Sequence, residues 1–148
     1  MIELAATITI TAGSAFLFVY WFRYTCLLIL STKTAQDHTR TVAVANQLVF
    51  VEIQSQLRHS QADLEGLRRL LDRDYAVLTS LLRYTPDCSP KQSKIEVRML
   101  GINYRLLGLW YGLSRRFSIA AARRTLEEMS LVVAHFANMM GERAMCQG

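Results

Sequence analysis

The longest uncharged segment of the chain lies near its N-terminus. From residue 4 to residue 22 the sequence reads LAATITITAGSAFLFVYWF, 19 residues without a charged side chain. As a helix that rises about 1.5 Å per residue, this segment is about 28 Å long, which matches the roughly 30 Å hydrocarbon core of a bilayer. The pattern predicts an N-terminal transmembrane helix, and we assign residues 1–32 to this anchor and its juxtamembrane end.

The C-terminal border of this span carries aromatic and basic side chains. Trp21, Arg23 and Tyr24 stand where the uncharged run ends, as is typical of residues between the hydrocarbon and the lipid headgroups. Lys33 and Arg40 follow closely, so the positive-inside rule places the N-terminus outside and the rest of the chain in the cytoplasm. We expect a single-pass protein of the cell (inner) membrane that contacts membrane lipid.

Two other interpretations of the apolar run have less support. A cleaved secretory signal needs a basic region before the run, whereas none of residues 1–3 is basic. A buried helix of a soluble protein rarely contains so long an uncharged run with an aromatic and basic border. The membrane anchor is therefore the preferred interpretation.

Small residues share one face of the expected membrane helix. Ala5, Thr9 and Gly13 recur at intervals of four residues, and small side chains at this spacing let a second helix approach closely. We therefore expect these three residues to pack against another membrane helix. The alternative is that they are ordinary small residues of a single-span anchor.

After a linker at residues 33–40, apolar residues follow helical spacing through the rest of the chain. Steps of three, four and seven residues place them on one side of a helix, and no strand-like alternation of useful length competes with this pattern. The positions are Leu57, Leu64, Leu67, Leu71, Tyr75, Leu78 and Leu82, and then Ile95, Met99, Ile102, Leu106, Leu109 and Leu113. The fold class expected is all-α.

The strongest break in this helical pattern contains both prolines of the chain. Pro86 and Pro90 lie in the polar stretch TPDCSPKQS, which predicts a turn at residues 86–92. Ser93 and Glu96 then form an S-x-x-E capping box, which predicts the start of the next helix.

A reversal at the prolines brings two strongly apolar stretches together. Folding the chain about residue 89 sets residue 48 near residue 130, so that QLVFVEI meets LVVAHFANMM. We therefore expect residues 41–148 to form a long antiparallel helical hairpin that is coiled-coil-like.

A second irregularity lies further along the chain. The next clean apolar series begins at Leu126, and the separation from Leu113 is one residue short of two heptads. Such a slip in phase predicts a kink or a short break at residues 114–118.

The apolar positions are too numerous for two helices to cover. Beside the first row after the prolines, Leu100, Tyr104, Leu107 and Tyr111 form a second row. Two apolar faces on one helix imply more than one neighbour, so we expect a homo-oligomer or a subunit of a larger membrane protein complex. The residues expected at helix contacts are Leu106, Trp110, Leu113, Val133 and Phe136. The alternative is a broad face covered by lipid or by the linker.

Composition and charge narrow the class of partner. The chain is 51% hydrophobic and 20% charged, with a net charge of +5 that would suit nucleic acid, an anionic lipid surface or an acidic protein. Residues 86–148 hold 9 basic and 5 acidic side chains and so carry +4 of this charge. Among them Arg98, Arg105, Arg116 and Arg123 form a basic row, either a solvated face or a surface for anionic headgroups or an acidic partner. We expect no nucleic acid, because no nucleic-acid module is recognised.

Acidic and basic side chains mix at helical spacing before the prolines. They are Asp63, Glu65, Arg68, Arg69, Asp72, Arg73 and Asp74. Such a pattern favours either a solvent-facing helix or charge pairs that set the register of one helix on another.

The sequence offers little for catalysis or metal binding. It contains no G-x-S-x-G, P-loop, G-x-G-x-x-G, H-E-x-x-H or C-x-x-C motif. Cys26, Cys88 and Cys146 form an odd set that implies no disulfide framework. We therefore expect no enzyme, no cofactor and no metal site. The alternative is a copper(I) or haem site made of soft ligands near the C-terminus. Those ligands would be His135, Met139, Met140, Met145 and Cys146.

These features predict a non-catalytic, single-pass membrane protein that acts as a structural, assembly or accessory subunit through helix–helix association. A second hypothesis is a membrane-anchored regulatory or sensory module with a basic lipid- or partner-binding face. The break at residues 114–118 suggests it, because a slip in phase can separate two packings. A third hypothesis, an enzyme or cofactor carrier, depends on the C-terminal soft ligands alone.

Overall fold

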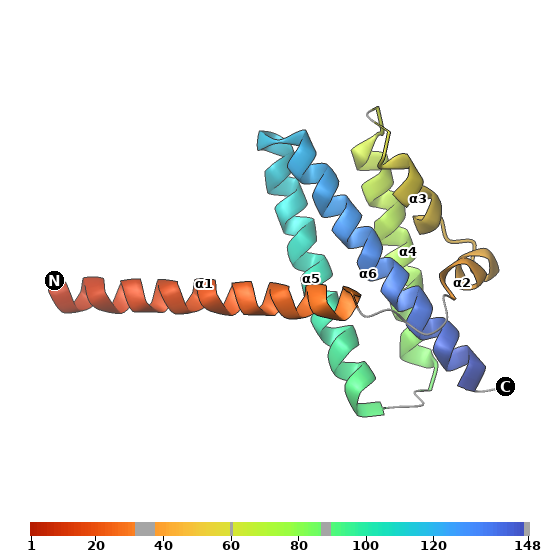
Figure 1. Ribbon diagram of the computed structural model, residues 1–148, viewed down its shortest axis with the longest axis horizontal. Helices are drawn as coiled ribbons and strands as arrows, with labels where there is room; N and C mark the ends of the chain where they lie inside the picture. The colour runs from red at the N-terminus through yellow and green to blue at the C-terminus, as the bar shows by residue number, and fades with distance from the viewer. Residues whose placement is uncertain (32–37, 60, 87–89, 147–148) are drawn as a thin grey trace. The chain divides into compact units, whose positions relative to one another are not determined.

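The computed structural model describes residues 1–31, 38–59, 61–86 and 90–146, without the side chains of residues 90–93. Within this part of the chain there are six α-helices and no β-strand, so the all-helical prediction is confirmed (Figure 1). The helices divide into two compact units, Met1–Thr32 and Lys33–Gly148. The second unit is called the helical domain below.

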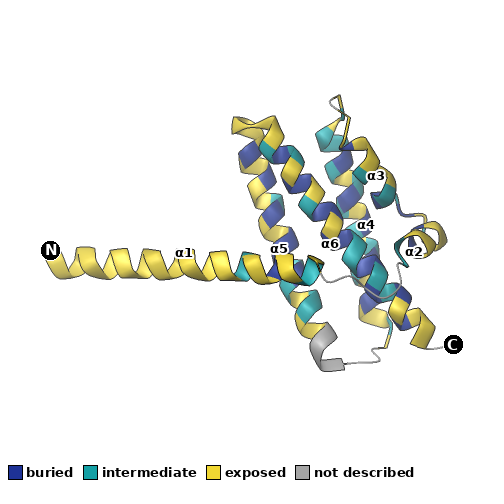
Figure 2. Ribbon diagram, viewed as in Figure 1, coloured by how far each residue is buried: buried dark blue, intermediate teal, exposed yellow. Residues whose placement is uncertain are grey.

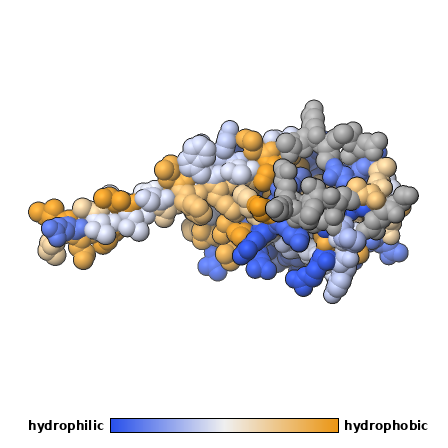
Figure 3. Space-filling model, turned by 90° about the horizontal axis from the view of Figure 1, so that it is seen from below, coloured by the Kyte–Doolittle hydropathy of each residue, from blue (hydrophilic) through white to orange (hydrophobic). Residues whose placement is uncertain are grey.

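The first unit is the helix α1 (Ile2–Ser31), which has 30 residues and is long and apolar enough to cross a membrane. Figure 2 shows that α1 is exposed along most of its length, and Figure 3 shows apolar side chains, in orange, along its N-terminal part. The hydroxyl groups of Thr7, Thr9 and Thr11 each donate to the carbonyl oxygen four residues earlier at 2.8 Å. Such bonds let hydroxyl groups lie in apolar surroundings without water.

The described part of the helical domain contains five helices, of which α6 is central. They are α2 (Thr39–Ala45), α3 (Phe50–Gln56), α4 (Leu64–Tyr84), α5 (Pro90–Phe117) and α6 (Ile119–Cys146). Helix α6 contacts each of the other four, and its residues Leu126, Met129, Val133 and Phe136 are fully buried. Because α6 has neighbours on several sides, its own apolar residues occur on more than one face of the helix.

Two hydrogen bonds show the directions of the long helices. Arg143 Nη1, near the end of α6, donates to the carbonyl oxygen of Leu82, near the end of α4, at 2.7 Å, and Figure 1 shows that α4 and α6 run in the same direction. Arg68 Nη1, early in α4, donates to the carbonyl oxygen of Gly108, in the second half of α5, at 3.3 Å. Helix α5 is therefore antiparallel to the other two.

The short helices α2 and α3 run along α6 in the opposite direction. The backbone N–H of His38 donates to Asn138 Oδ1 at 2.9 Å, and Gln54 Nε2 donates to Ser130 Oγ at 3.4 Å. The backbones of both short helices also lie close to that of α6. The apolar stretches that begin at residues 47 and 131 are thus neighbours, as the sequence predicts.

The described helices do not form the single hairpin expected over residues 41–148, because the described part of the helical domain reverses direction three times. Helix α4 ends at Tyr84 and α5 begins at Pro90, so one reversal lies at the prolines, although residues 87–89 fall outside the described residues. Two more reversals separate α3 from α4 and α5 from α6. The chain forms shorter helices that pack around α6 instead of two extended helices. This arrangement lets α6 bury apolar residues that two extended helices would expose.

Two finer expectations about α5 also differ from the structure. The helix begins at Pro90, three residues before Ser93, because the fixed φ of proline suits the first turn of a helix. Within the described residues the backbones of α4 and α5 do not approach closely, so the two helices do not pack as a coiled coil.

Ser118 makes the reversal between α5 and α6. Its backbone N–H donates to the carbonyl oxygen of Ser114 at 2.7 Å, which closes the last turn of α5. Its Oγ accepts the N–H of Ala121 at 3.3 Å, which caps the first turn of α6. The break predicted at residues 114–118 is confirmed, and it is a full reversal of direction.

Candidate functional site

The outer side of α5 carries a row of exposed apolar side chains. Leu109 is 75% exposed and Trp110 is 56% exposed, whereas Leu107 and Tyr111 on the opposite side are buried. We call this row the α5 outer row. It consists of Ile95, Ile102, Leu106, Leu109, Trp110, Leu113 and Phe117.

The α5 outer row includes three of the five residues expected at helix contacts. Within this chain Leu106, Trp110 and Leu113 are exposed, whereas Val133 and Phe136 are fully buried, so a contact at the first three would need a partner and stays a prediction. Helix α5 has two apolar rows, and the second row contacts the rest of the domain. Asn103 and Ser114 of α5 are also buried.

The basic row expected from the sequence is divided by the reversal at Ser118. Arg98, Arg105 and Arg116 are exposed on one side of α5, next to the α5 outer row. Arg123 lies instead on α6, where it is half-buried and its Nη1 donates to the carbonyl oxygen of Leu57 at 3.2 Å. The basic face therefore contains three of the four expected arginines.

A layer of polar and aromatic side chains joins α4 to α5. Arg68 Nε binds both carboxylate oxygens of Asp72 at 3.0–3.1 Å, and the hydroxyl of Tyr104 donates to Asp72 Oδ1 at 2.9 Å. The ring of Tyr104 stacks on that of Tyr75, with 3.9 Å between their centroids. Burial, followed by the charge of Asp72, raises the pKa of Tyr104, so its hydroxyl stays protonated.

This polar layer fixes the register of α4 and α5. Nearer the start of α4, Glu65 forms an ion pair with Arg115 of α5. The mixed charges of residues 63–74 therefore include pairs that join neighbouring helices, which was one of the two interpretations of that pattern.

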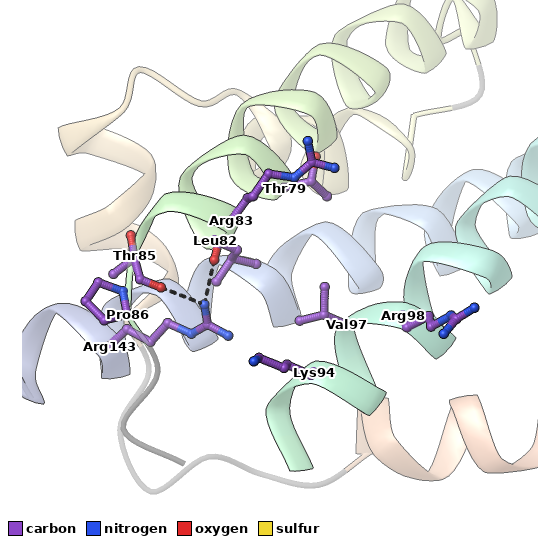
Figure 4. Close-up of a pocket in the computed structure, with 9 residues that line it drawn as sticks. All are labelled: Thr79, Leu82, Arg83, Thr85, Pro86, Lys94, Val97, Arg98 and Arg143. Carbon is purple, nitrogen blue, oxygen red and sulfur yellow. Dashed lines mark hydrogen bonds between the residues drawn. The ribbon is translucent and has the colours of Figure 1, made fainter. Parts of the chain in front are cut away.

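A pocket of about 580 Å³ lies between the end of α4, the start of α5 and the last turns of α6 (Figure 4). Leu82, Pro86 and Val97 supply its apolar lining. Its polar lining consists of Thr79, Arg83, Thr85, Lys94, Arg98 and Arg143. All charged side chains among these described lining residues are basic.

Arg143 is the buried cation of this pocket. It is 6% exposed, and its Nη1 donates to the carbonyl oxygens of Leu82 at 2.7 Å and Thr85 at 3.3 Å. A cation at this place is favoured because the last carbonyl groups of α4 carry the negative end of the helix dipole. Sequence reasoning missed Arg143, although the basic residues that flank the two prolines were a signal for a basic site near the turn.

The expected membrane contacts all lie on α1. A side chain added at Gly13 would meet nothing within 4 Å, and Thr9 donates its hydroxyl to the carbonyl oxygen of Ala5. The rings of Trp21 and Tyr24 pack edge to face with 6.2 Å between their centroids, on either side of Arg23 in the sequence. These residues therefore leave a surface of small side chains in the first half of α1 and an aromatic border in the second.

The proposed soft-ligand cluster is spread over the last turns of α6. Met139 is buried and Met140 and His135 are half-buried, whereas Met145 and Cys146 are exposed. Among the described residues, no group of three His, Cys, Asp or Glu side chains is placed to hold a metal ion. Cys88 lies outside the described residues.

Comparisons with models of protein families, with curated proteins and with solved structures give no significant match to this chain. The features available for inferring its function are therefore α1, the α5 outer row with its arginines, and the basic pocket.

Proposed function

We propose that this chain is a non-catalytic, single-pass membrane protein that acts as a structural, assembly or accessory subunit. Helix α1 is the membrane anchor, and the positive-inside rule places the helical domain in the cytoplasm. The α5 outer row packs against another protein chain, which is a second copy or a different subunit of a membrane complex. No chemical step is assigned to the protein.

The exposure of the α5 outer row is the observation that supports this function. The helical domain cannot hide these side chains itself, because the opposite side of α5 already contacts α6. Contiguous apolar patches on soluble domains typically mark sites where a protein or a membrane binds. A partner that covers the row would remove large aliphatic and aromatic side chains from water.

The composition of the surface favours a protein as the partner. Trp110 lies among aliphatic residues, and Arg105 and Arg116 lie at the border of the row. An apolar centre with a charged rim is the usual anatomy of a protein interface, and Trp and Arg are enriched among the residues that contribute most to binding.

Site-directed photocrosslinking in the native membrane tests this function. A benzophenone side chain at position 109, on the α5 outer row, should give a crosslinked adduct with a second protein. The same side chain at position 144, exposed at the end of α6, is the matched control and should give none. Native mass spectrometry of the complex, extracted in mild detergent, would then report the partner and the copy number.

A matched pair of substitutions completes the test. Leu109→Glu should disrupt the complex, whereas Leu131→Glu, at an apolar residue of α6 that is 47% exposed, should leave it intact. A strictly monomeric particle with no adduct at position 109 and no copurifying protein would contradict the proposed function.

A second function, a regulatory module with a lipid-binding face, is favoured by one specific observation. Arg98, Arg105 and Arg116 are exposed beside the α5 outer row, and a helix with apolar and basic residues side by side suits the surface of an anionic membrane. Reversing these three charges should then abolish binding to vesicles that contain phosphatidylglycerol while the protein complex remains. If it disrupts the complex and leaves vesicle binding unchanged, the protein interface is the better explanation.

A further inference from the structure

The pocket between α4, α5 and α6 is a distinct feature that the assembly function does not use. Basic side chains reach it from three helices: Arg83 from α4, Lys94 and Arg98 from α5, and Arg143 from α6. We propose that it binds a phosphate group, carried either by a lipid headgroup or by a soluble phosphorylated compound.

The described charged side chains that line the pocket are all basic. Elsewhere on α4 and α5, Arg68 is paired with Asp72 and Arg115 with Glu65. Within the described part of the chain, Arg83, Lys94 and Arg98 have no ion pair, and no acidic side chain lines the pocket. Several cations around one concave site create a positive potential that attracts an anion.

The arrangement of the cations suits a compact anion. Figure 4 shows that Arg143 and Lys94 point toward the same space from opposite sides, while Arg83 and Arg98 lie at the margins with their charged ends directed outward. Arg143 is held in place by its bonds to the carbonyl oxygens of Leu82 and Thr85. One cation is therefore fixed before binding, and flexible, exposed side chains can close over the ligand.

The size and the sign of the charge favour phosphate over a less charged ligand. The volume of about 580 Å³ is within the range of roughly 300–1,000 Å³ that is usual for small-molecule pockets. Arg143 and Lys94 inside the pocket, with Arg83 and Arg98 at its margins, match a phosphate dianion better than a single carboxylate, and Arg and Lys are the side chains that recognise phosphate oxygens.

The two threonines contribute shape rather than hydrogen-bond donors. The hydroxyls of Thr79 and Thr85 each donate at 2.8 Å to a carbonyl oxygen one turn earlier in α4. Binding therefore depends on the cations, which makes charge removal the informative substitution.

Titration of the full-length chain in nanodiscs tests the phosphate site. In the first arm the nanodiscs contain phosphatidylcholine alone, and inorganic pyrophosphate is titrated by isothermal calorimetry. In the second arm phosphatidic acid replaces part of the lipid, and the unfolding temperature of the helical domain is measured without pyrophosphate. Binding in the first arm identifies a soluble ligand, and an effect in the second arm alone identifies a lipid headgroup.

Two double variants distinguish binding at the pocket from attraction by the net positive charge of the protein. Arg83→Ala with Lys94→Ala should weaken binding at least about tenfold, because each removes a charge-assisted contact. Arg69→Ala with Arg124→Ala removes the same charge from exposed positions outside the pocket and should leave binding within about twofold. All four side chains are exposed, so neither variant should lose helicity by circular dichroism.

Two results would overturn the phosphate site. One is equal weakening in both double variants, which would show attraction by net charge alone. The other is no binding in either arm. Neither result bears on the protein interface at the α5 outer row, because no partner is present in these measurements.

Discussion

The carboxylate of Asp74, in the middle of α4, accepts a hydrogen bond from the backbone N–H of Phe50 at 2.8 Å. The same oxygen, Oδ2, accepts the N–H of Val49 at 2.7 Å, and the Asp74 side chain is fully buried. These N–H groups open the first turn of α3, where Val49 as the N-cap has no side chain that could accept them. A carboxylate from one helix thus caps another and ties α3 to α4.

Removing this cap should destabilise the helical domain. Asp74→Ala should lower the free energy of unfolding by about 2–4 kcal/mol, because it leaves the buried N–H of Phe50 and the partly buried N–H of Val49 without their acceptor. Asp74→Asn should cost less, since an amide oxygen still accepts. Urea unfolding of the full chain in detergent micelles, followed by circular dichroism, measures both. Asp63→Ala, at an exposed residue before α4 that makes no cap hydrogen bond, should change the free energy by at most about 0.5 kcal/mol.

Gly141 allows the close approach of α6 to the start of α2. A Cβ atom at this position would lie 2.3 Å from the Cβ of His38, so Gly141→Ala must displace the segment around His38. We expect a loss of about 1–3 kcal/mol in the free energy of unfolding. Gly112→Ala is the matched control, because its new Cβ meets nothing within 4 Å, and it should stabilise the domain by up to about 1 kcal/mol. Equal effects of the two substitutions would contradict this packing.

The two apolar rows of α5 can be told apart by truncation. Leu107 is 2% exposed and Leu109 is 75% exposed. Leu107→Ala should therefore lower the free energy of unfolding by about 2–5 kcal/mol. Leu109→Ala should change it by about 0.5 kcal/mol or less in the absence of a partner. A larger loss of stability for Leu109→Ala than for Leu107→Ala in urea unfolding would mean that the row containing Leu109, and not the row containing Leu107, faces α6.

His135 should make the domain less stable in mild acid. Burial lowers the pKa of His135, although the carboxylate of Glu142 opposes this effect, and Glu96 Oε2 lies 3.9 Å away, beyond hydrogen-bond distance. In the unfolded chain the imidazole has its ordinary pKa of about 6.5. As the pH falls below about 6.5, the unfolded state takes up a proton that the native state does not. The free energy of unfolding should therefore decrease by up to about 1.4 kcal/mol per pH unit until the lower native pKa is reached.

The contribution of His135 can be separated from that of other groups. Urea unfolding at pH 7.5 and pH 5.5 should show a smaller pH dependence for His135→Gln than for the unaltered chain. His59→Gln, at an exposed histidine, should keep the full dependence. An unchanged pH dependence in His135→Gln would show that other groups cause the loss of stability.

Local patterns in the sequence were sufficient for several features. A run of 19 uncharged residues identifies α1 because length and apolar character are properties of the segment itself. The two prolines place the reversal before α5, and the slip in phase places the one at Ser118, since both act on the backbone locally. The size of the turn at Ser118 was not predicted, because a slip of one residue is compatible with a kink as well as with a reversal.

Features that depend on several helices at once required the tertiary structure. Periodicity predicts two apolar rows on α5 that are equally suitable for burial. Only packing against α6 decides that Leu107 is buried and Leu109 is exposed. In the sequence Asp74 resembles a residue of a solvated charged face, and its burial depends on N–H groups 24 and 25 residues earlier in the chain. Arg143 joins Arg83 and Lys94 only because α6 ends beside the end of α4. The sequence by itself determined which segments are helical and where the chain can turn, because those are local preferences. The partners of each buried face and each charge were decided by the packing of helices that are distant in the sequence.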